Sequence, residues 1–159
     1  MEKGALKLGE ILVKKGWATS GVVDAALAKQ KRTREFLGEI LLKDKKVSEE
    51  HLAMALSEQS GLPFARLTQF SIDWSLALRF SVALVLEKKC FPLRVIEDEI
   101  TFAITNVLDA WMLSQIENEC REYRVRLVLV TPKDMNELMT RYREYVNIKI
   151  QKQLESGNF

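Results

Sequence analysis

The sequence is poor in the residues that form covalent cross-links, metal sites and acid–base pairs. Its 159 residues include only two cysteines and one histidine. Cys90 and Cys120 lack a CxxC spacing, so we expect two buried, reduced thiols rather than a disulfide or a zinc site. His51 follows Glu49 and Glu50 at the expected start of a helix, where carboxylates favour the helix dipole, so no metal site is predicted there. We expect no catalytic residues and no enzymatic activity.

Long hydrophobic runs and an excess of one charge are also missing. The longest apolar run, from Ser75 to Leu86, is interrupted by Arg79 and is too short to cross a bilayer. Lys and Arg total 24 against 22 for Asp and Glu, a formal net charge of +2. This balance gives no reason to expect a broad nucleic-acid surface, and the N-terminus has no secretory pattern. We expect a cytosolic protein without a membrane span and without a nucleic-acid partner.

What the sequence does contain is an internal repeat. Residues 7–30 recur as residues 36–59 after a shift of 29 positions. The repeat predicts two copies of one helical unit packed on each other, with an apolar face left between them as a contact or ligand surface. The identical pairs are Leu8 and Leu37, Gly9 and Gly38, Glu10 and Glu39, Ile11 and Ile40, Leu12 and Leu41, Lys14 and Lys43, Ala26 and Ala55, Leu27 and Leu56, and Gln30 and Gln59.

Each copy has the pattern of two short helices joined by a turn. Apolar residues at i, i+3 and i+4 predict an amphipathic helix at the start of each copy. Gly16 then stands where a left-handed stop is needed, and Lys45 occupies the same place in the second copy. Thr19 or Ser20 in the first copy and Ser48 in the second are candidate N-caps for the following helix.

After a boundary within residues 62–71 the pattern becomes mixed. We expect an α/β chain of the α+β type, with a helical tandem-repeat subdomain at residues 1–62 and a β-β-α-β-α subdomain at residues 63–155. Thr131 followed by Pro132 marks the start of the last helix. The expected segments are short helices at 73–80 and 81–89, a hairpin of strands 90–96 and 100–105, a helix at 109–123, a strand at 125–130 and a closing helix to about residue 154.

Two alternative interpretations concern the aromatic residues and the second copy of the repeat. Trp17, Trp74 and Trp111 lie within or beside apolar stripes, which favours core packing over ligand stacking. Residues 52–63 superficially resemble a helix-turn-helix, but residues 64–73 supply only Arg66 where a basic recognition helix would be needed. A DNA-binding role is therefore not favoured.

Several motifs together resemble a known family. The doubled Leu-Gly-x-x-Leu segment ending in Gln is followed by Gln59-Ser-Gly-Leu-Pro63, Ile72-Asp73 and Phe91-Pro92-Leu93. Across residues 6–142 this arrangement resembles the N-terminal region of type II secretion and type IV pilus assembly ATPases. The resemblance implies a helical module of the MshEN tandem-repeat type, which in some members binds cyclic di-GMP. In the secretion branch the module docks the motor onto an inner-membrane platform protein.

The resemblance also assigns a candidate ligand set. The family's leading arginine corresponds to Lys7 and Phe36, so both arginines are missing here. Lys7 keeps only a point charge, whereas Phe36 loses the charge but offers a ring that can stack on a purine. The candidate cyclic di-GMP contacts implied by the resemblance are Lys7, Leu8, Gly9, Gln30, Phe36, Leu37, Gly38 and Gln59.

A second candidate surface is the basic run between the two copies. Two interpretations of this run are open: a patch that binds a partner or a phosphate group, or a solvated linker. Its basic residues are Lys31, Arg32 and Arg34. The chain contains no Gly-x-x-x-x-Gly-Lys-Ser/Thr loop, so it does not contain the family's motor. We expect a regulatory or docking module that binds a platform protein or a motor domain, peripheral to the inner membrane through that partner. The alternative is a cyclic di-GMP sensor, and we expect no other cofactor.

Overall fold

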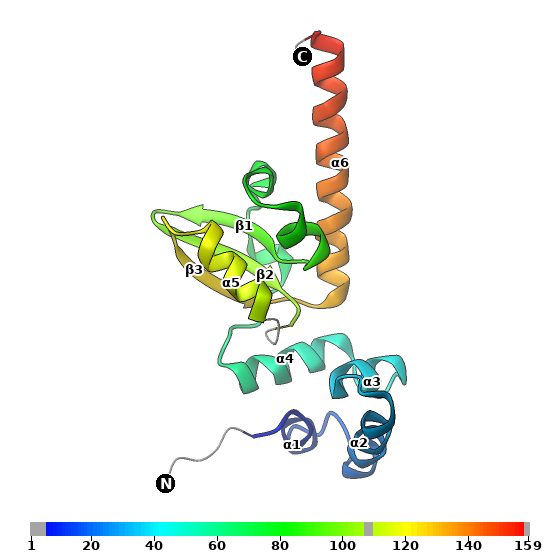
Figure 1. Cartoon of the computed structure of the whole chain (residues 1–159). Coiled ribbons are helices and arrows are strands. Elements are labelled where there is room, and N and C mark those ends of the chain that lie inside the picture. Colours follow the sequence, from blue (N-terminus) through cyan, green and yellow to red (C-terminus); the bar gives the residue numbers. More distant parts are fainter. Residues whose placement is uncertain (1–5, 107–109, 158–159) are drawn as a thin grey trace. The chain divides into compact units, whose positions relative to one another are not determined.

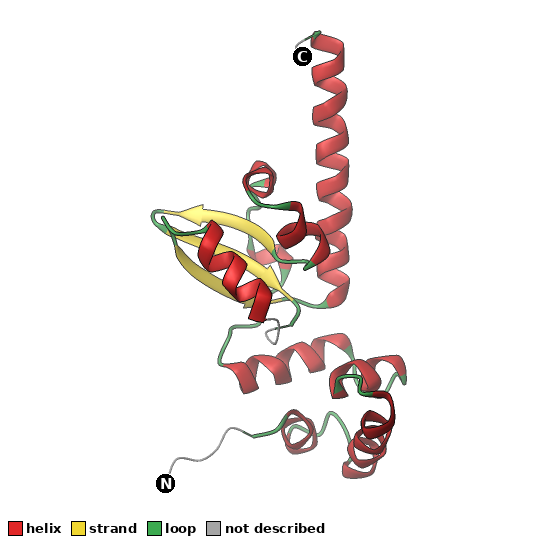
Figure 2. Cartoon of the chain, in the orientation of Figure 1, coloured by secondary structure: helices red, strands yellow, loops and turns green. Residues whose placement is uncertain are grey.

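The computed structural model describes residues 6–106 and 110–157, and the chain divides into two compact units (Figure 1). The first unit ends at Phe64 and the second begins at Ala65, which lies within the boundary segment indicated by the sequence. The first unit is helical, and the second combines helices with a small sheet (Figure 2). The expected α+β fold class is confirmed.

The helical unit consists of two helix pairs that match the two sequence copies. Its helices are α1 (Leu8–Lys14), α2 (Ser20–Thr33), α3 (Leu37–Lys43) and α4 (Glu49–Ser60). The N-caps follow the sequence pattern, since Thr19 Oγ1 accepts a hydrogen bond from the Val22 amide at 3.2 Å. Ser48 Oγ does the same for the His51 amide at 3.1 Å. The turn between the paired helices is left-handed in both copies, at Gly16 with φ 72° and at Lys45 with φ 53°.

The two copies share one core and use the same close contact. Leu12 and Leu41, which are equivalent in sequence, are both fully buried in a single hydrophobic cluster. A Cβ built on Gly9 would lie 2.6 Å from Val23 Cγ1, and one on Gly38 would lie 3.1 Å from Leu52 Cδ1. Because Val23 and Leu52 are themselves equivalent positions, the glycine of each Leu-Gly motif lets the first helix of a copy approach the second.

The second unit contains a three-stranded sheet in the order β1-β2-β3. Strands β1 and β2 are antiparallel and form the expected hairpin, with an irregularity between Pro92 and Arg94. Strand β3 lies parallel to β2, after a crossover that contains α5. The elements are η1 (Leu67–Gln69), η2 (Trp74–Arg79), η3 (Ala83–Glu87), β1 (Phe91–Ile96), β2 (Glu99–Ile104), α5 (Ala110–Glu119), β3 (Arg124–Leu129) and α6 (Pro132–Ser156).

The sheet and the first half of α6 form the core of this unit. Thr131 Oγ1 accepts from the Asp134 amide at 3.1 Å, so the predicted cap begins α6. Buried side chains of β1, β2 and β3 pack against Met135, Leu138 and Tyr142 on α6. The later turns of α6 extend beyond the sheet in Figure 1, and their apolar side chains are exposed, with Leu154 56% exposed.

The short helices expected at residues 73–80 and 81–89 both form. They are a 3-10 helix at Trp74–Arg79 and a π-helical turn at Ala83–Glu87. The Leu76 amide donates to the Asp73 carbonyl three residues earlier, and the Lys88 amide donates to the Ala83 carbonyl five residues earlier. The Asp73 amide also donates to the Leu93 carbonyl of β1. This contact with the sheet fixes the start of the first helix, and such tertiary contacts can outweigh local α-helical propensity.

One expectation for this unit is wrong, because Trp111 is 41% exposed rather than part of the core. It lies beside the buried α5 stripe formed by Met112 and Ile116, and the Lys88 Nζ is 5.3 Å from its ring centroid. Trp74 does pack as expected, edge-on against Phe91 with ring centroids 5.8 Å apart. The helix expected from residue 109 begins at Ala110, and residue 109 lies outside the described residues.

Candidate functional site

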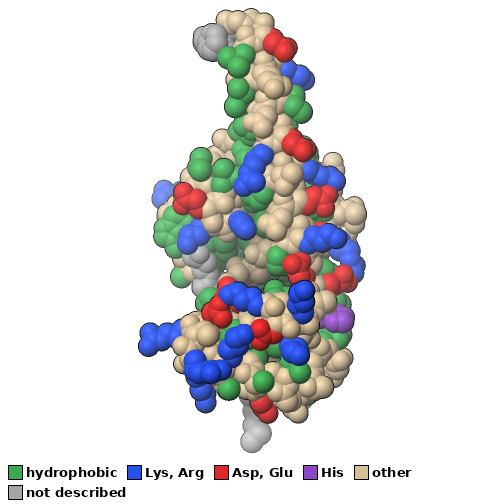
Figure 3. Space-filling model, turned by 90° about the vertical axis from the view of Figure 1, so that its right-hand side faces the viewer, with side chains coloured by type: hydrophobic (Ala, Val, Ile, Leu, Met, Phe, Trp, Pro, Cys, Tyr) green, Lys and Arg blue, Asp and Glu red, His purple; other side chains and the backbone are tan. Residues whose placement is uncertain are grey.

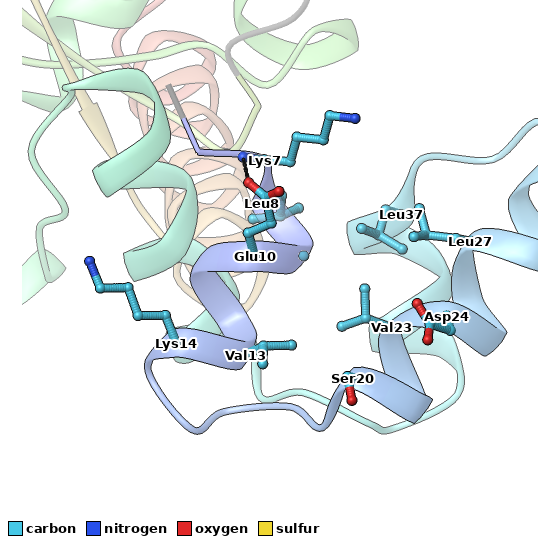
Figure 4. Close-up of a pocket in the computed structure, with 11 residues that line it drawn as sticks. Lys7, Leu8, Glu10, Val13, Lys14, Ser20, Val23, Asp24, Leu27 and Leu37 are labelled. Atoms are coloured by element: carbon cyan, nitrogen blue, oxygen red, sulfur yellow. Dashed lines mark hydrogen bonds between the residues drawn. The ribbon is translucent and has the colours of Figure 1, made fainter. Parts of the chain in front are cut away.

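A groove of about 700 Å³ lies in the helical unit between α1 and α2. Figure 4 shows Leu8 and Val13 on α1 facing Val23 and Leu27 on α2, with Leu37 from the start of α3 at one end. Val13 and Leu27 are each 39% exposed, so the groove presents apolar surface to water. The complete lining is Lys7, Leu8, Gly9, Glu10, Val13, Lys14, Ser20, Val23, Asp24, Leu27 and Leu37.

Charged groups surround the groove in equal numbers. Lys7 and Lys14 are the two cations of the lining, and Glu10 and Asp24 are the two anions. Glu10 is held in place because its Oε2 accepts from the Lys7 amide at 2.9 Å, which caps α1. The Lys14 ammonium points away from the space between the two helices in Figure 4. The groove is therefore apolar inside and close to neutral at its rim.

The structure brings together half of the residues that the resemblance assigned to a ligand. Lys7, Leu8, Gly9 and Leu37 line the groove. The other four, Gln30, Phe36, Gly38 and Gln59, are not among its lining residues.

The four remaining residues have other environments. The Gln30 side-chain amide donates to the Glu35 carbonyl at 3.1 Å and so closes the α2–α3 turn. Gly38 is buried against Leu52, whereas Gln59 is exposed near the end of α4. Phe36 is 53% exposed at the N-terminus of α3, where its amide donates to Glu39 Oε2 at 3.3 Å.

The sequence comparison of the two copies missed several lining residues. Glu10, Val13, Lys14, Ser20 and Asp24 were not singled out as ligand or partner contacts. Helical spacing could have indicated some of them, because Gly9 and Val13 are four residues apart and therefore lie on one face of α1. Ser20, Asp24 and Leu27 have the corresponding spacing on α2.

The basic run occupies the end of α2 and the turn after it. Lys31 and Arg32 lie in the last turn of α2, and Arg34 is its left-handed C-cap with φ 59°. All three side chains belong to exposed residues. Two acidic neighbours are engaged elsewhere, since Lys43 pairs with Glu35 and Lys29 Nζ lies 2.8 Å from Asp44 Oδ1.

The histidine and cysteine side chains, which are the residue types most often found in catalytic and metal sites, pack against other residues of the fold. His51 stacks on Trp17 with ring centroids 4.6 Å apart and an interplanar angle of 8°. Burial raises the pKa of the Cys120 thiol to about 11 and raises that of Cys90 further, so both are poor nucleophiles near neutral pH. Over residues 6–106 and 110–157, no cluster of three or more His, Cys, Asp or Glu side chains is arranged to hold a metal.

Residues 64–70 do not form a recognition helix. They contain an isolated bridge residue at Phe64 and the three-residue η1, so the helix-turn-helix alternative lacks its second helix. In the part of the chain that the structure describes, no helix combines the length and apolar character needed to cross a bilayer.

Comparison with known proteins identifies relatives of the whole arrangement. The family model described as the MshEN domain matches residues 60–146, more than half of the chain and mostly in the second unit. The tandem repeat of residues 7–59, for which the MshEN type was expected, precedes all of the matched residues. The type IV pilus assembly ATPase PilB of Thermus thermophilus is 32% identical over 137 residues, which cover 86% of this chain and 15% of PilB. The bacteriophage adsorption protein B of Escherichia coli K12 is 28% identical over 123 residues, covering 77% of this chain and 16% of that protein.

Solved structures share the fold. The structure of MshE with cdg superimposes with a TM-score of 0.75 and 23% identity, covering 86% of this chain and 99% of that one. The N-terminal domain of XpsE gives a TM-score of 0.65 at 14% identity, covering 84% of this chain and 92% of that one. With the family match, these findings show that the chain belongs to the MshEN domain family and resembles the N-terminal domains of type II secretion and type IV pilus assembly ATPases.

Proposed function

We propose that the chain is a non-enzymatic docking module that binds a protein partner of a secretion or pilus machinery through the groove between α1 and α2. The observation that carries this proposal is the open apolar lining of the groove. Covering partly exposed side chains such as Val13 and Leu27 with apolar groups of a partner removes them from water, which favours association. The aliphatic lining consists of Leu8, Val13, Val23, Leu27 and Leu37.

The chemistry of the groove fits an amphipathic helix of the partner. Such a helix buries apolar side chains at positions i, i+3, i+4 and i+7 in a groove and keeps its polar face in water. The balanced rim of Lys7, Lys14, Glu10 and Asp24 provides both charges for polar flanks on the partner. Family resemblance points to the cytoplasmic part of an inner-membrane platform protein, which would keep this module in the cytoplasm and at the membrane through its partner.

The first test places a charge in the groove. Leu27→Glu is expected to weaken binding to the cytoplasmic part of the cognate platform protein by at least about tenfold, because an unpaired carboxylate would be buried in the complex. Biolayer interferometry measures the change. Leu78→Glu is the matched control, since Leu78 is 45% exposed and lies in the other unit. Equal affinity for the Leu27 variant and the unchanged protein would exclude the groove as the docking site.

The second candidate function is a cyclic di-GMP sensor. It is favoured by the likeness to MshE, whose solved structure contains cdg, and by the position of Lys7, Leu8 and Gly9 along the groove. The loss of both family arginines weakens this candidate, because a charge-assisted hydrogen bond contributes about 1.5–3 kcal/mol. The groove also carries as many carboxylates as ammonium groups in its lining.

Calorimetry with cyclic di-GMP separates the two functions. A sensor that uses the groove is expected to bind with micromolar or tighter affinity, and Lys7→Glu is expected to weaken that binding by at least about tenfold, because Lys7 is a cation of the groove lining. Lys149→Glu is the matched control, because Lys149 is exposed on α6 of the other unit. Absence of any binding heat would leave docking as the function of the groove.

A further inference from the structure

A second surface of the helical unit is strongly basic and is distinct from the groove. Between residues 29 and 46 the chain has seven Lys and Arg residues and three carboxylates. We define the basic face by the five of these cations that make no ion pair in the described structure. Its members are Lys31, Arg32, Arg34, Lys45 and Lys46, all of them exposed.

Two ion pairs bring the two halves of the basic face together. Lys29 on α2 pairs with Asp44 after α3, and Lys43 at the end of α3 pairs with Glu35 before it. These contacts tie the turn after α3, which carries Lys45 and Lys46, to the last turns of α2. Figure 3 shows several Lys and Arg side chains over the helical unit, with Asp and Glu side chains between some of them.

The carboxylates of this segment do not neutralise the basic face. Glu35 and Asp44 are each occupied by a lysine, and Glu39 accepts from the Phe36 amide. The hydrogen bond from Lys43 lowers the pKa of the Glu35 carboxyl, so this pair stays ionised near neutral pH. With seven cations against three carboxylates, residues 29–46 keep a net positive charge, and the five cations outside the ion pairs are exposed and attract an anionic partner.

An exposed aromatic side chain adjoins these cations. Phe36 follows Arg34 by two residues and is 53% exposed. A phenyl ring gains free energy when it enters the boundary between headgroups and acyl chains, and surfaces that combine Lys and Arg with Phe are typical of proteins that lie on membranes. A segment made only of acidic residues would pair with the cations but would leave the ring in water. The combination favours a lipid surface.

We propose that the basic face and Phe36 dock the helical unit directly on a bilayer that contains anionic phospholipids. The cations lie over the headgroups, and the ring of Phe36 enters the interface beside them. Each Lys or Arg close to an anionic bilayer strengthens association by roughly fivefold, so five together suffice for reversible binding at low ionic strength. The groove residues Leu27 and Val13 take no part in this contact.

Co-sedimentation with vesicles tests the proposal. The whole chain is mixed with vesicles of about one-third phosphatidylglycerol and two-thirds phosphatidylcholine, and with vesicles of phosphatidylcholine alone. Binding is expected only to the anionic vesicles and is expected to fall as salt is raised, because exposed charges are screened. Lys31→Glu, Arg32→Glu and Arg34→Glu together are expected to weaken binding by at least about 100-fold.

Matched variants make the outcome decisive. Arg121→Glu, Arg143→Glu and Lys149→Glu together change the net charge equally on exposed positions of the other unit, and this variant is expected to bind as the unchanged chain does. Phe36→Ser keeps every charge and is expected to bind several-fold more weakly, which tests the proposal even if the triple variant does not fold. No binding to anionic vesicles, equal loss in both triple variants, or binding to polyglutamate but not to vesicles would overturn the proposal.

Discussion

Leu41→Ala is expected to lower the free energy of unfolding of the helical unit by about 2–5 kcal/mol, because it removes buried methyl groups and leaves a cavity. Leu41 is fully buried in the cluster that also contains Leu12 and Ile40, so the two sequence copies depend on the same core. Native-state hydrogen exchange of peptides from α1 to α4 measures the change in this unit separately from the other one.

The control for this prediction is Leu27→Ala. Leu27 is 39% exposed in the groove, so truncating it removes less buried surface and is expected to cost well under half as much. Leu12→Ala, at the equivalent position of the first copy, is expected to have an effect similar to that of Leu41→Ala. If Leu41→Ala were no more destabilising than Leu27→Ala, the shared core of the two copies would not be what stabilises this unit.

Phe91→Ala is expected to destabilise the second unit by about 3–5 kcal/mol. Phe91 is fully buried on β1 and makes edge-to-face contacts with Trp74 of η2 and with Tyr142 of α6, at centroid distances of 5.8 and 5.5 Å. One side chain therefore joins the sheet, the 3-10 segment and the last helix. Urea unfolding followed by tryptophan fluorescence measures the loss, and Trp74 reports on this contact directly.

Ile96→Ala provides a control on the same strand. Ile96 is 54% exposed at the end of β1, and substitutions at such positions usually change stability by less than about 0.5 kcal/mol. A loss for Phe91→Ala that is no larger than the loss for Ile96→Ala would contradict the central position of Phe91 in this core.

The duplication is preserved in the core and has diverged on the surface. Gly9 and Gly38 make equivalent close approaches to Val23 and Leu52, because any larger residue would push the paired helices apart. No such constraint acts on the residue before each Leu-Gly motif, where Lys7 lies at the groove and Phe36 stands exposed beside the basic run. The two copies thus have the same packing but different surfaces.

Local sequence patterns were sufficient for most elements. The i, i+3, i+4 stripes, the caps at Thr19, Ser48 and Thr131 and the two strands of the hairpin depend on residues close together in the chain, and the structure confirms them. Local patterns did not indicate the helix types at residues 73–89, and the core position expected for Trp111 is wrong. There, contacts with β1 and with neighbouring helices decide the conformation, and a local pattern contains no information about them.

The sequence by itself determined the duplicated helical unit, the α+β order and the family to which the chain belongs, because repeats, caps and motifs are properties of neighbouring residues. Only the tertiary structure decided that the groove lies chiefly within the first copy, with Leu37 contributed by the second. It also decided that Lys29 and Lys43 form ion pairs with Asp44 and Glu35, while the other five cations of residues 31–46 are exposed. Both depend on how helices pack in space, and packing is set by the fit of side chains that are distant in the chain.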